Sequence, residues 1–80
     1  MELQKIRKII SEVLKTEESR IEASSLFVED LGADSLDLVQ IWMKIEEEFN
    51  VEVETSLMDE ADTVQAAADV VTLLTHASPR

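Results

Sequence analysis

Hydrophobic residues recur every three or four positions over most of this chain, and that spacing predicts amphipathic helices. The first predicted helix covers about residues 3–15, the second covers residues 35–49, and a short third helix covers residues 56–60. A last helix follows Thr63. The connection at residues 16–34 has weaker periodicity, and structureless loops of this length are uncommon in small domains, so we expect a short helical turn within it. The pattern therefore predicts an all-α fold.

The second helix has recognisable signals at both of its ends. Gly32, the one glycine of the chain, permits a turn with positive φ just before the helix. Asp34, with Asp37 three residues later, forms an acidic version of a capping box, which makes Asp34 the predicted N-cap. Asn50 is the predicted stop. These assignments place Ser35 in the first helical turn, free of capping and with its hydroxyl directed outward.

The last helix is capped in our prediction by Asp62 and Thr63, with Gln65 as the partner in a capping box. Its inward-facing residues are predicted to be Val64, Ala67, Val71 and Leu74, with Val70 beside them. From Thr75 onward the chain is expected to fray.

The second helix carries apolar residues on more than one face. Its predicted core stripe comprises Leu38, Ile41, Trp42, Ile45 and Phe49. Leu36, Val39 and Met43 lie roughly 100–160° away from Leu38 around the helix axis, and we call these three residues the apolar strip. Two interpretations of this strip are open. Either the helix is central and covered on both sides, or the strip is exposed and partner proteins dock on it.

The composition indicates one small folded domain, covering residues 1–80. Of its 80 residues, 45% are apolar and none is cysteine, which excludes disulfides and thiolate metal sites. No apolar run approaches the length of a membrane span or a signal sequence. We therefore expect a cytoplasmic monomer without membrane insertion, or an organellar protein if a transit peptide has been removed.

The negative charge is concentrated in one part of the chain. Residues 29–62 contain twelve acidic side chains and a single basic one, Lys44, a balance of −11 that equals the net charge of the whole chain. Such a surface disfavours nucleic acid as a partner and favours a basic protein surface. The alternative is that the acidic residues only keep a small domain in solution.

The chain lacks the groups that would make Ser35 a catalytic nucleophile. A serine needs a nearby base, and the single histidine, His76, is near the C-terminus, where we expect it to be solvated. Neither a nucleophile-elbow motif nor a phosphate-binding glycine loop is present. The carboxylates of Asp34 and Asp37 are too weakly basic to deprotonate a hydroxyl near neutral pH. We therefore expect no enzyme activity, and we interpret Ser35 as the acceptor of a modification.

The stretch LGADSLDLVQIWMKIEEEFNVEV closely resembles the acyl carrier proteins of the fatty-acid and polyketide type, whose D-S-L triad carries 4′-phosphopantetheine on its serine. Asp34, Ser35 and Leu36 match this triad, and the resemblance continues through TVQAAADVV in the last helix. It implies a four-helix bundle with three main helices, a short third helix and a long loop between the first two. It also implies an arm attached to Ser35 by a phosphopantetheinyl transferase, with acyl intermediates held as thioesters on the arm.

The resemblance further implies where partners and cargo bind. Acyl-processing enzymes with basic docking patches would contact Asp37, Val39, Gln40, Met43, Glu46 and Glu47. A cavity that shelters the acyl chain would be lined by Val39, Ile45, Ala61, Ala67 and Ala68. The chain departs from the family pattern at Gln40, where glutamate is common, and at Trp42, which is bulkier than the usual aliphatic residue. These departures leave open which pathway the carrier serves.

Two alternatives to a fatty-acid or polyketide carrier are open. One is a carrier of aminoacyl, peptidyl or D-alanyl groups, which would share the fold and the arm. The other is an acidic helical protein-interaction module. A calcium-binding EF-hand is disfavoured because the segment EDLGADSLDLVQ has its glycine out of register and ends without glutamate. We therefore predict no specific metal site, and only loose binding of cations to the acidic face.

Overall fold

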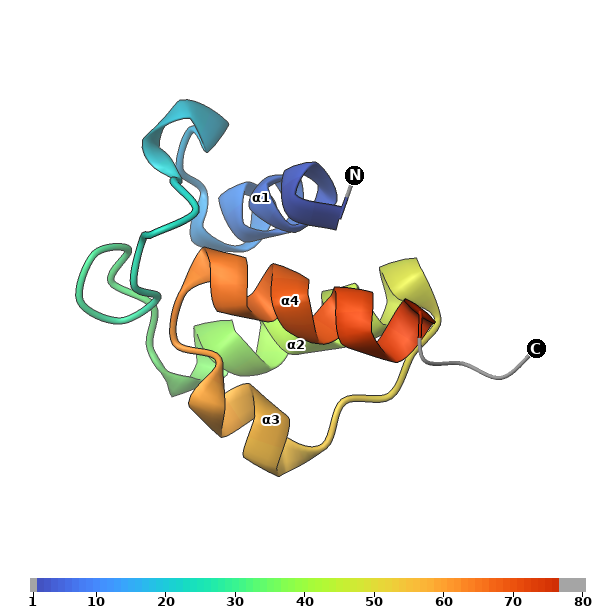
Figure 1. Ribbon diagram of the computed structural model, residues 1–80. Helices are drawn as coiled ribbons and strands as arrows, with labels where there is room; N and C mark the ends of the chain where they lie inside the picture. The colour runs from blue at the N-terminus through green and yellow to red at the C-terminus, as the bar shows by residue number, and fades with distance from the viewer. Residues whose placement is uncertain (1, 77–80) are drawn as a thin grey trace.

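The computed structural model describes residues 2–76, which fold into four α-helices and one short 3-10 helix (Figure 1). The elements are α1 (Glu2–Leu14), η1 (Glu18–Arg20), α2 (Ser35–Phe49), α3 (Thr55–Glu60) and α4 (Val64–His76). The described residues contain no named strand, and their one β-bridge joins Leu26 to Thr63. The predicted all-α fold is confirmed. Within residues 2–76, no helix combines the length and hydropathy that crossing a membrane would need.

The core lies where α1 contacts both α2 and α4 (Figure 1). Each of these three helices turns aliphatic side chains inward at helical spacing. Fully buried examples are Ile6 and Ile10 of α1, Ile41 and Ile45 of α2, and Val64 and Val71 of α4. Removing such a side chain from water contributes about 1.5–3 kcal/mol. The short helix α3 packs against α4 and completes the bundle.

Both ends of α2 have the predicted geometry. The Asp34 carboxylate accepts a hydrogen bond from the Asp37 N–H at 2.9 Å, and the Asp37 carboxylate accepts one from the Asp34 N–H at 3.2 Å. This reciprocal pair is a capping box. Gly32 has a φ of +72°, and Asn50 ends the helix in the left-handed conformation with a φ of 55°. The start of α2 is therefore held by residues on both sides of Ser35, Asp34 before it and Asp37 after it.

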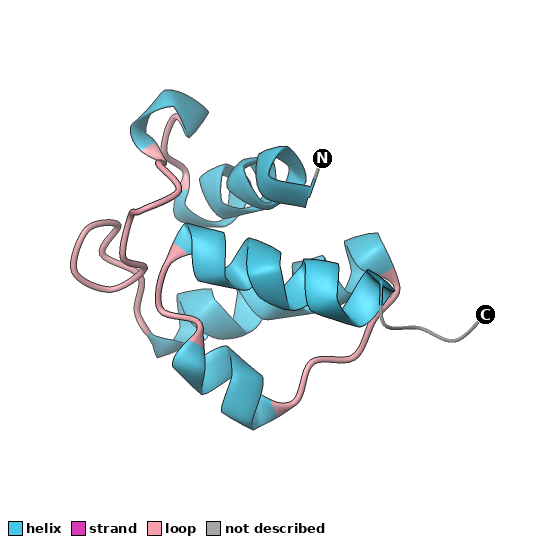
Figure 2. Ribbon diagram, in the orientation of Figure 1, coloured by secondary structure: helices cyan, strands magenta, loops and turns pink. Residues whose placement is uncertain are grey.

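The long connection between α1 and α2 follows a defined path, which Figure 2 shows in pink on either side of the short helix η1. η1 is the short helical turn that was expected within residues 16–34. Ile21 and Phe27 anchor the connection in the core, with 1% and 2% of their surface exposed.

Main-chain hydrogen bonds also hold this connection against the start of α4. The Phe27 N–H donates to the Asp62 carbonyl at 3.0 Å. In the other direction, the Val64 N–H donates to the Ser25 carbonyl at 3.1 Å, and the Gln65 N–H donates to the Ala23 carbonyl at 2.8 Å. Peptide groups that a loop would otherwise leave unpaired are satisfied in this way.

The predicted capping of α4 is wrong in part. Thr63 is the residue that caps, because its Oγ1 accepts the Ala66 N–H at 3.1 Å. Since the helix begins at Val64, Gln65 is one position too early to close a box, and its side chain instead donates to Asp69 at 2.9 Å. Asp62 contributes its carbonyl to the connection rather than a cap to the helix.

The prediction that the chain frays from Thr75 is also wrong for Thr75 and His76. α4 continues to His76, and the Thr75 hydroxyl donates to the Val71 carbonyl at 2.9 Å, which adds a bond to the last turn. The His76 side chain and residues 77–80 lie outside the described part of the chain. The expectation that this histidine is solvated stays a prediction.

Candidate functional site

Ser35 is the first residue of α2, and its side chain is exposed. The Asp34 carboxylate occupies the capping position, so the serine hydroxyl is not needed to satisfy the first N–H groups of the helix. Ser35 makes no side-chain hydrogen bond to any other residue that the structure describes. The hydroxyl therefore lies at a capped helix start and is accessible from solvent.

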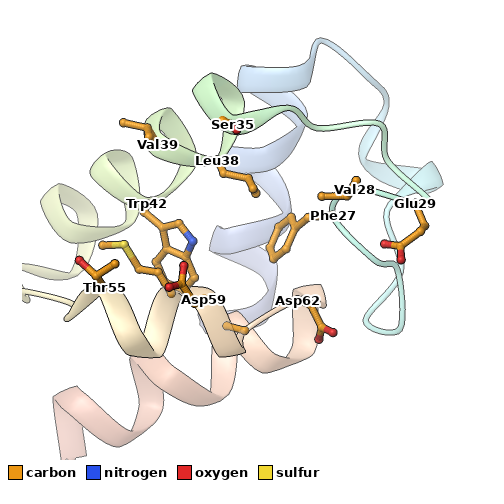
Figure 3. Close-up of a pocket in the computed structure, with 12 residues that line it drawn as sticks. Phe27, Val28, Glu29, Ser35, Leu38, Val39, Trp42, Thr55, Asp59 and Asp62 are labelled. Atoms are coloured by element: carbon orange, nitrogen blue, oxygen red, sulfur yellow. The ribbon is translucent and has the colours of Figure 1, made fainter.

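A cavity of about 490 Å³ opens beside Ser35, between the connection, α2 and α3. Figure 3 shows Phe27, Leu38 and Trp42 gathered around this space, with Glu29 and Asp62 toward its outer side. The apolar walls include Phe27, Val28, Leu38, Val39, Trp42 and Met58. Its polar lining comprises the hydroxyls of Ser35 and Thr55 and the carboxylates of Glu29, Asp59 and Asp62. A space of this volume is in the range of small-molecule sites in proteins, which is about 300–1,000 Å³.

The residues predicted to line an acyl cavity fall into two groups. Val39 and Ala61 line the cavity beside Ser35. Ile45, Ala67 and Ala68 are packed in the core, with 0–4% of their surface exposed, and they are not among the residues that line this space. The assignment of those three to the lining stays a prediction.

The apolar strip on α2 is exposed. Leu36, Val39 and Met43 have 65%, 53% and 55% of their surface in contact with solvent. On the same helix, Ile41 and Ile45 are fully buried. The first interpretation, in which other elements cover both apolar faces of α2, is therefore wrong. One of these faces remains exposed in the described chain.

The polar residues predicted to flank the strip differ in whether their side chains make hydrogen bonds within the protein. Gln40 and Glu47 are exposed. The Glu46 carboxylate accepts a hydrogen bond from the Val53 N–H at 2.8 Å, and the Asp37 carboxylate is held in the capping box. Both carboxylates thus support the local structure, and Glu47 is the freest negative charge of this set.

The described side chains offer no group of three or more histidine, cysteine, aspartate or glutamate residues that could hold a metal ion. The acidic residues near Ser35 are spread along the connection, α2 and α3 rather than converging on one point. Glu29, Asp59 and Asp62 are all exposed. Their arrangement generates a negative field around the cavity entrance.

Several residues of the site were not indicated by the sequence pattern. Phe27 anchors the connection in the core, and it also forms a wall of the cavity. Val28 and Glu29 beside it, and Thr55 and Asp59 on α3, carry no periodic signal that relates them to Ser35. The one local sign in the sequence is Val28, a large apolar residue in a loop next to acidic residues, and the structure leaves 57% of its surface exposed.

Comparison with known families gives a match over most of the chain. Residues 4–71 match the family model described as "Phosphopantetheine attachment site". The matched range extends from α1 to Val71 in α4, so it includes Ser35, the apolar strip and every residue that lines the cavity.

Proposed function

The chain belongs to the phosphopantetheine attachment-site family, and on that premise we propose that Ser35 holds the 4′-phosphopantetheine arm of a carrier protein. The observation that carries the proposal is the exposed Ser35 hydroxyl at a capped helix start, directly beside a cavity with apolar walls. A phosphodiester forms between Ser35 Oγ and the phosphorus of the arm, the hydroxyl proton passes to a base of the transferase, and the nucleotide part of a coenzyme A donor leaves.

Attachment at Ser35 fits the chemistry of its surroundings. The protein supplies position and access, while the transferase supplies the base and the phosphopantetheinyl donor. Once attached, the arm offers a terminal thiol, a group that the chain itself lacks because it contains no cysteine. In this proposal the domain tethers reactive thioesters and presents them to other enzymes, and catalysis belongs to those enzymes.

We propose further that the carried groups are acyl chains of fatty-acid or polyketide type. The walls of the cavity are predominantly apolar, as an acyl chain requires, and the cavity begins at Ser35 itself. The strongly negative segment of residues 29–62 suits acyl-processing enzymes with basic docking surfaces. Loading by an acyl transferase, compared with loading by an adenylating amino-acid ligase, separates this proposal from an aminoacyl, peptidyl or D-alanyl carrier.

The attachment proposal is tested by co-expressing the chain with a broad-specificity phosphopantetheinyl transferase and measuring its intact mass. We expect one phosphopantetheinyl group per chain, and none on Ser35→Ala. Ser56→Ala is the matched control, since Ser56 is also an exposed serine in the first turn of a helix. Equal modification of the Ser35→Ala variant, or no mass gain on any form, would refute the assignment.

We propose that acyl-processing enzymes dock on the apolar strip of α2, and Met43→Ser in this strip tests the proposal. Leu73→Ser on α4 is the control, because Leu73 is exposed to a similar extent, 58% against 55% for Met43. We expect Met43→Ser to raise the KM of an acyl transferase for the arm-bearing, unacylated carrier by about fivefold, the size of an ordinary interface contribution, with kcat little changed. A larger effect of Leu73→Ser would place the docking surface on α4 instead.

A further inference from the structure

The indole N–H of Trp42 lacks a partner in the described part of the chain. Only 4% of the Trp42 surface is exposed, yet its Nε1 donates no hydrogen bond to any residue that the structure describes. The N–H of a largely buried tryptophan normally finds an acceptor in the protein or in water, because leaving it without either is costly. This donor therefore needs an explanation.

The indole N–H faces the cavity beside Ser35. Figure 3 shows the ring nitrogen of Trp42 on the edge that points toward Phe27 and Leu38, across the open space. Among the described side chains, the one fully enclosed and unpartnered polar atom is Nε of Arg7, so the Trp42 nitrogen keeps some access to the cavity. In the unloaded protein, water that enters the cavity can accept this hydrogen bond.

An acyl chain that fills the cavity would displace this water. A saturated chain then covers the N–H and offers no acceptor in exchange. A chain that carries a carbonyl or hydroxyl oxygen at the depth of the indole restores the hydrogen bond. Phe27 and Leu38, on the side of the ring that carries the N–H, have no acceptor atoms, and the hydroxyls and carboxylates that line the cavity make no hydrogen bond to the indole in the described chain. An oxygen of the cargo can therefore take this position.

The charge around the cavity limits the kind of oxygen that fits. Glu29, Asp59 and Asp62 are exposed carboxylates in the polar lining, and a negatively charged cargo would meet their repulsion. A carboxylate-ended chain is therefore disfavoured, while a neutral ketone or alcohol is accepted.

We propose, resting on the proposed function, that Trp42 is a specificity-determining residue whose indole N–H selects neutral acyl chains bearing a ketone or hydroxyl oxygen. One hydrogen bond of ordinary strength corresponds to about a fivefold preference over the saturated chain of equal length. The preference acts on the acyl group once the arm carries it. It therefore leaves the attachment of the arm to Ser35 unchanged.

The test uses the protein loaded with stable amide analogues of three arms: hexanoyl, 5-oxohexanoyl and the carboxylate-ended glutaryl. Because Trp42 is the single tryptophan, one indole N–H resonance reports the site in the NMR spectrum of labelled protein. We expect 5-oxohexanoyl to move this proton resonance downfield, and glutaryl to leave it at the unloaded position. Hexanoyl should give no downfield shift. The same response to hexanoyl and 5-oxohexanoyl, or no response to either, would overturn the proposal, and a downfield shift with glutaryl would overturn its charge argument.

Trp42→Phe provides the second measurement, since it keeps an aromatic ring and removes the donor. In the natural sequence, the difference in Tm between the 5-oxohexanoyl and hexanoyl forms should exceed the same difference in Trp42→Phe by about 4–8 °C. An equal difference in both proteins contradicts the role of the N–H. Intact mass separates the two levels of inference: absence of the arm refutes the proposed function, whereas a loaded arm without an indole response refutes the selectivity alone.

Discussion

The capping box at the start of α2 makes a quantitative prediction for Asp34→Ala. The substitution removes the carboxylate that accepts the Asp37 N–H at 2.9 Å, and it leaves that N–H without a partner in the protein. Losing an N-cap of this kind costs about 1 kcal/mol, within a range of about 0.5–2. For a domain of this size, 1 kcal/mol lowers Tm by about 4–8 °C.

Circular dichroism at 222 nm during heating and urea titration measures this loss. Asp34→Asn is the control, because asparagine retains an oxygen acceptor at the N-cap and should recover most of the stability. The double variant Asp34→Ala/Asp37→Ala should lose less stability than the sum of the two single variants. The reason is that each carboxylate accepts the backbone N–H of the other residue, so the two contributions are coupled. If Asp34→Ala melts at the same temperature as the natural sequence, the box does not hold the helix start, and our account of how Ser35 is positioned fails.

Three further predictions follow from the fold. Gly32→Ala should lower the free energy of unfolding in urea by about 1 kcal/mol. The cause is the φ of +72°, because no atom beyond the neighbouring residues lies within 4 Å of the added Cβ. Gly32→Asn should lose less stability, and equal losses would contradict this. Ile41→Ala, at a fully buried position, should lower the free energy of unfolding by about 2–5 kcal/mol. Leu36→Ala, at a position 65% exposed, should lower it by less than about 0.5 kcal/mol. Similar losses would show that the two faces of α2 are misassigned. Raising NaCl to ~0.5 M should increase Tm by about 5 °C by screening the net charge of −11, and an unchanged Tm would show that this repulsion costs no stability.

The features that depend on neighbouring residues could be predicted from the sequence. The periodicity of apolar side chains predicts α1, α2 and α4, and Asp34 with Asp37 predicts the start of α2 because both hydrogen bonds lie within one helical turn. Gly32 predicts a positive φ before the helix, and Asn50 predicts the helix stop, for the same local reason. The apolar strip was also visible in the sequence, although periodicity alone could not decide whether a partner helix covers it.

The features that depend on distant residues could not be predicted in this way. Asp62 and Thr63 are both good N-caps, and the choice between them follows from the hydrogen bonds that tie this backbone to residues 23–27. The Glu46 carboxylate bonds to the Val53 N–H, seven residues further along, after the chain has turned. The cavity likewise depends on the path that brings Phe27 opposite Trp42.

The attachment of the connection to α4 through peptide groups has a consequence for how this protein can evolve. Hydrogen bonds between backbone atoms place few demands on the side chains that flank them, so the exposed residues Val28 and Glu29 can be exchanged at little cost to folding. New contacts for different enzymes could therefore arise in the loop ahead of Ser35 while the loop keeps its position. In this loop, the side chains that a partner would contact can change without changing the backbone hydrogen bonds that hold the loop in place.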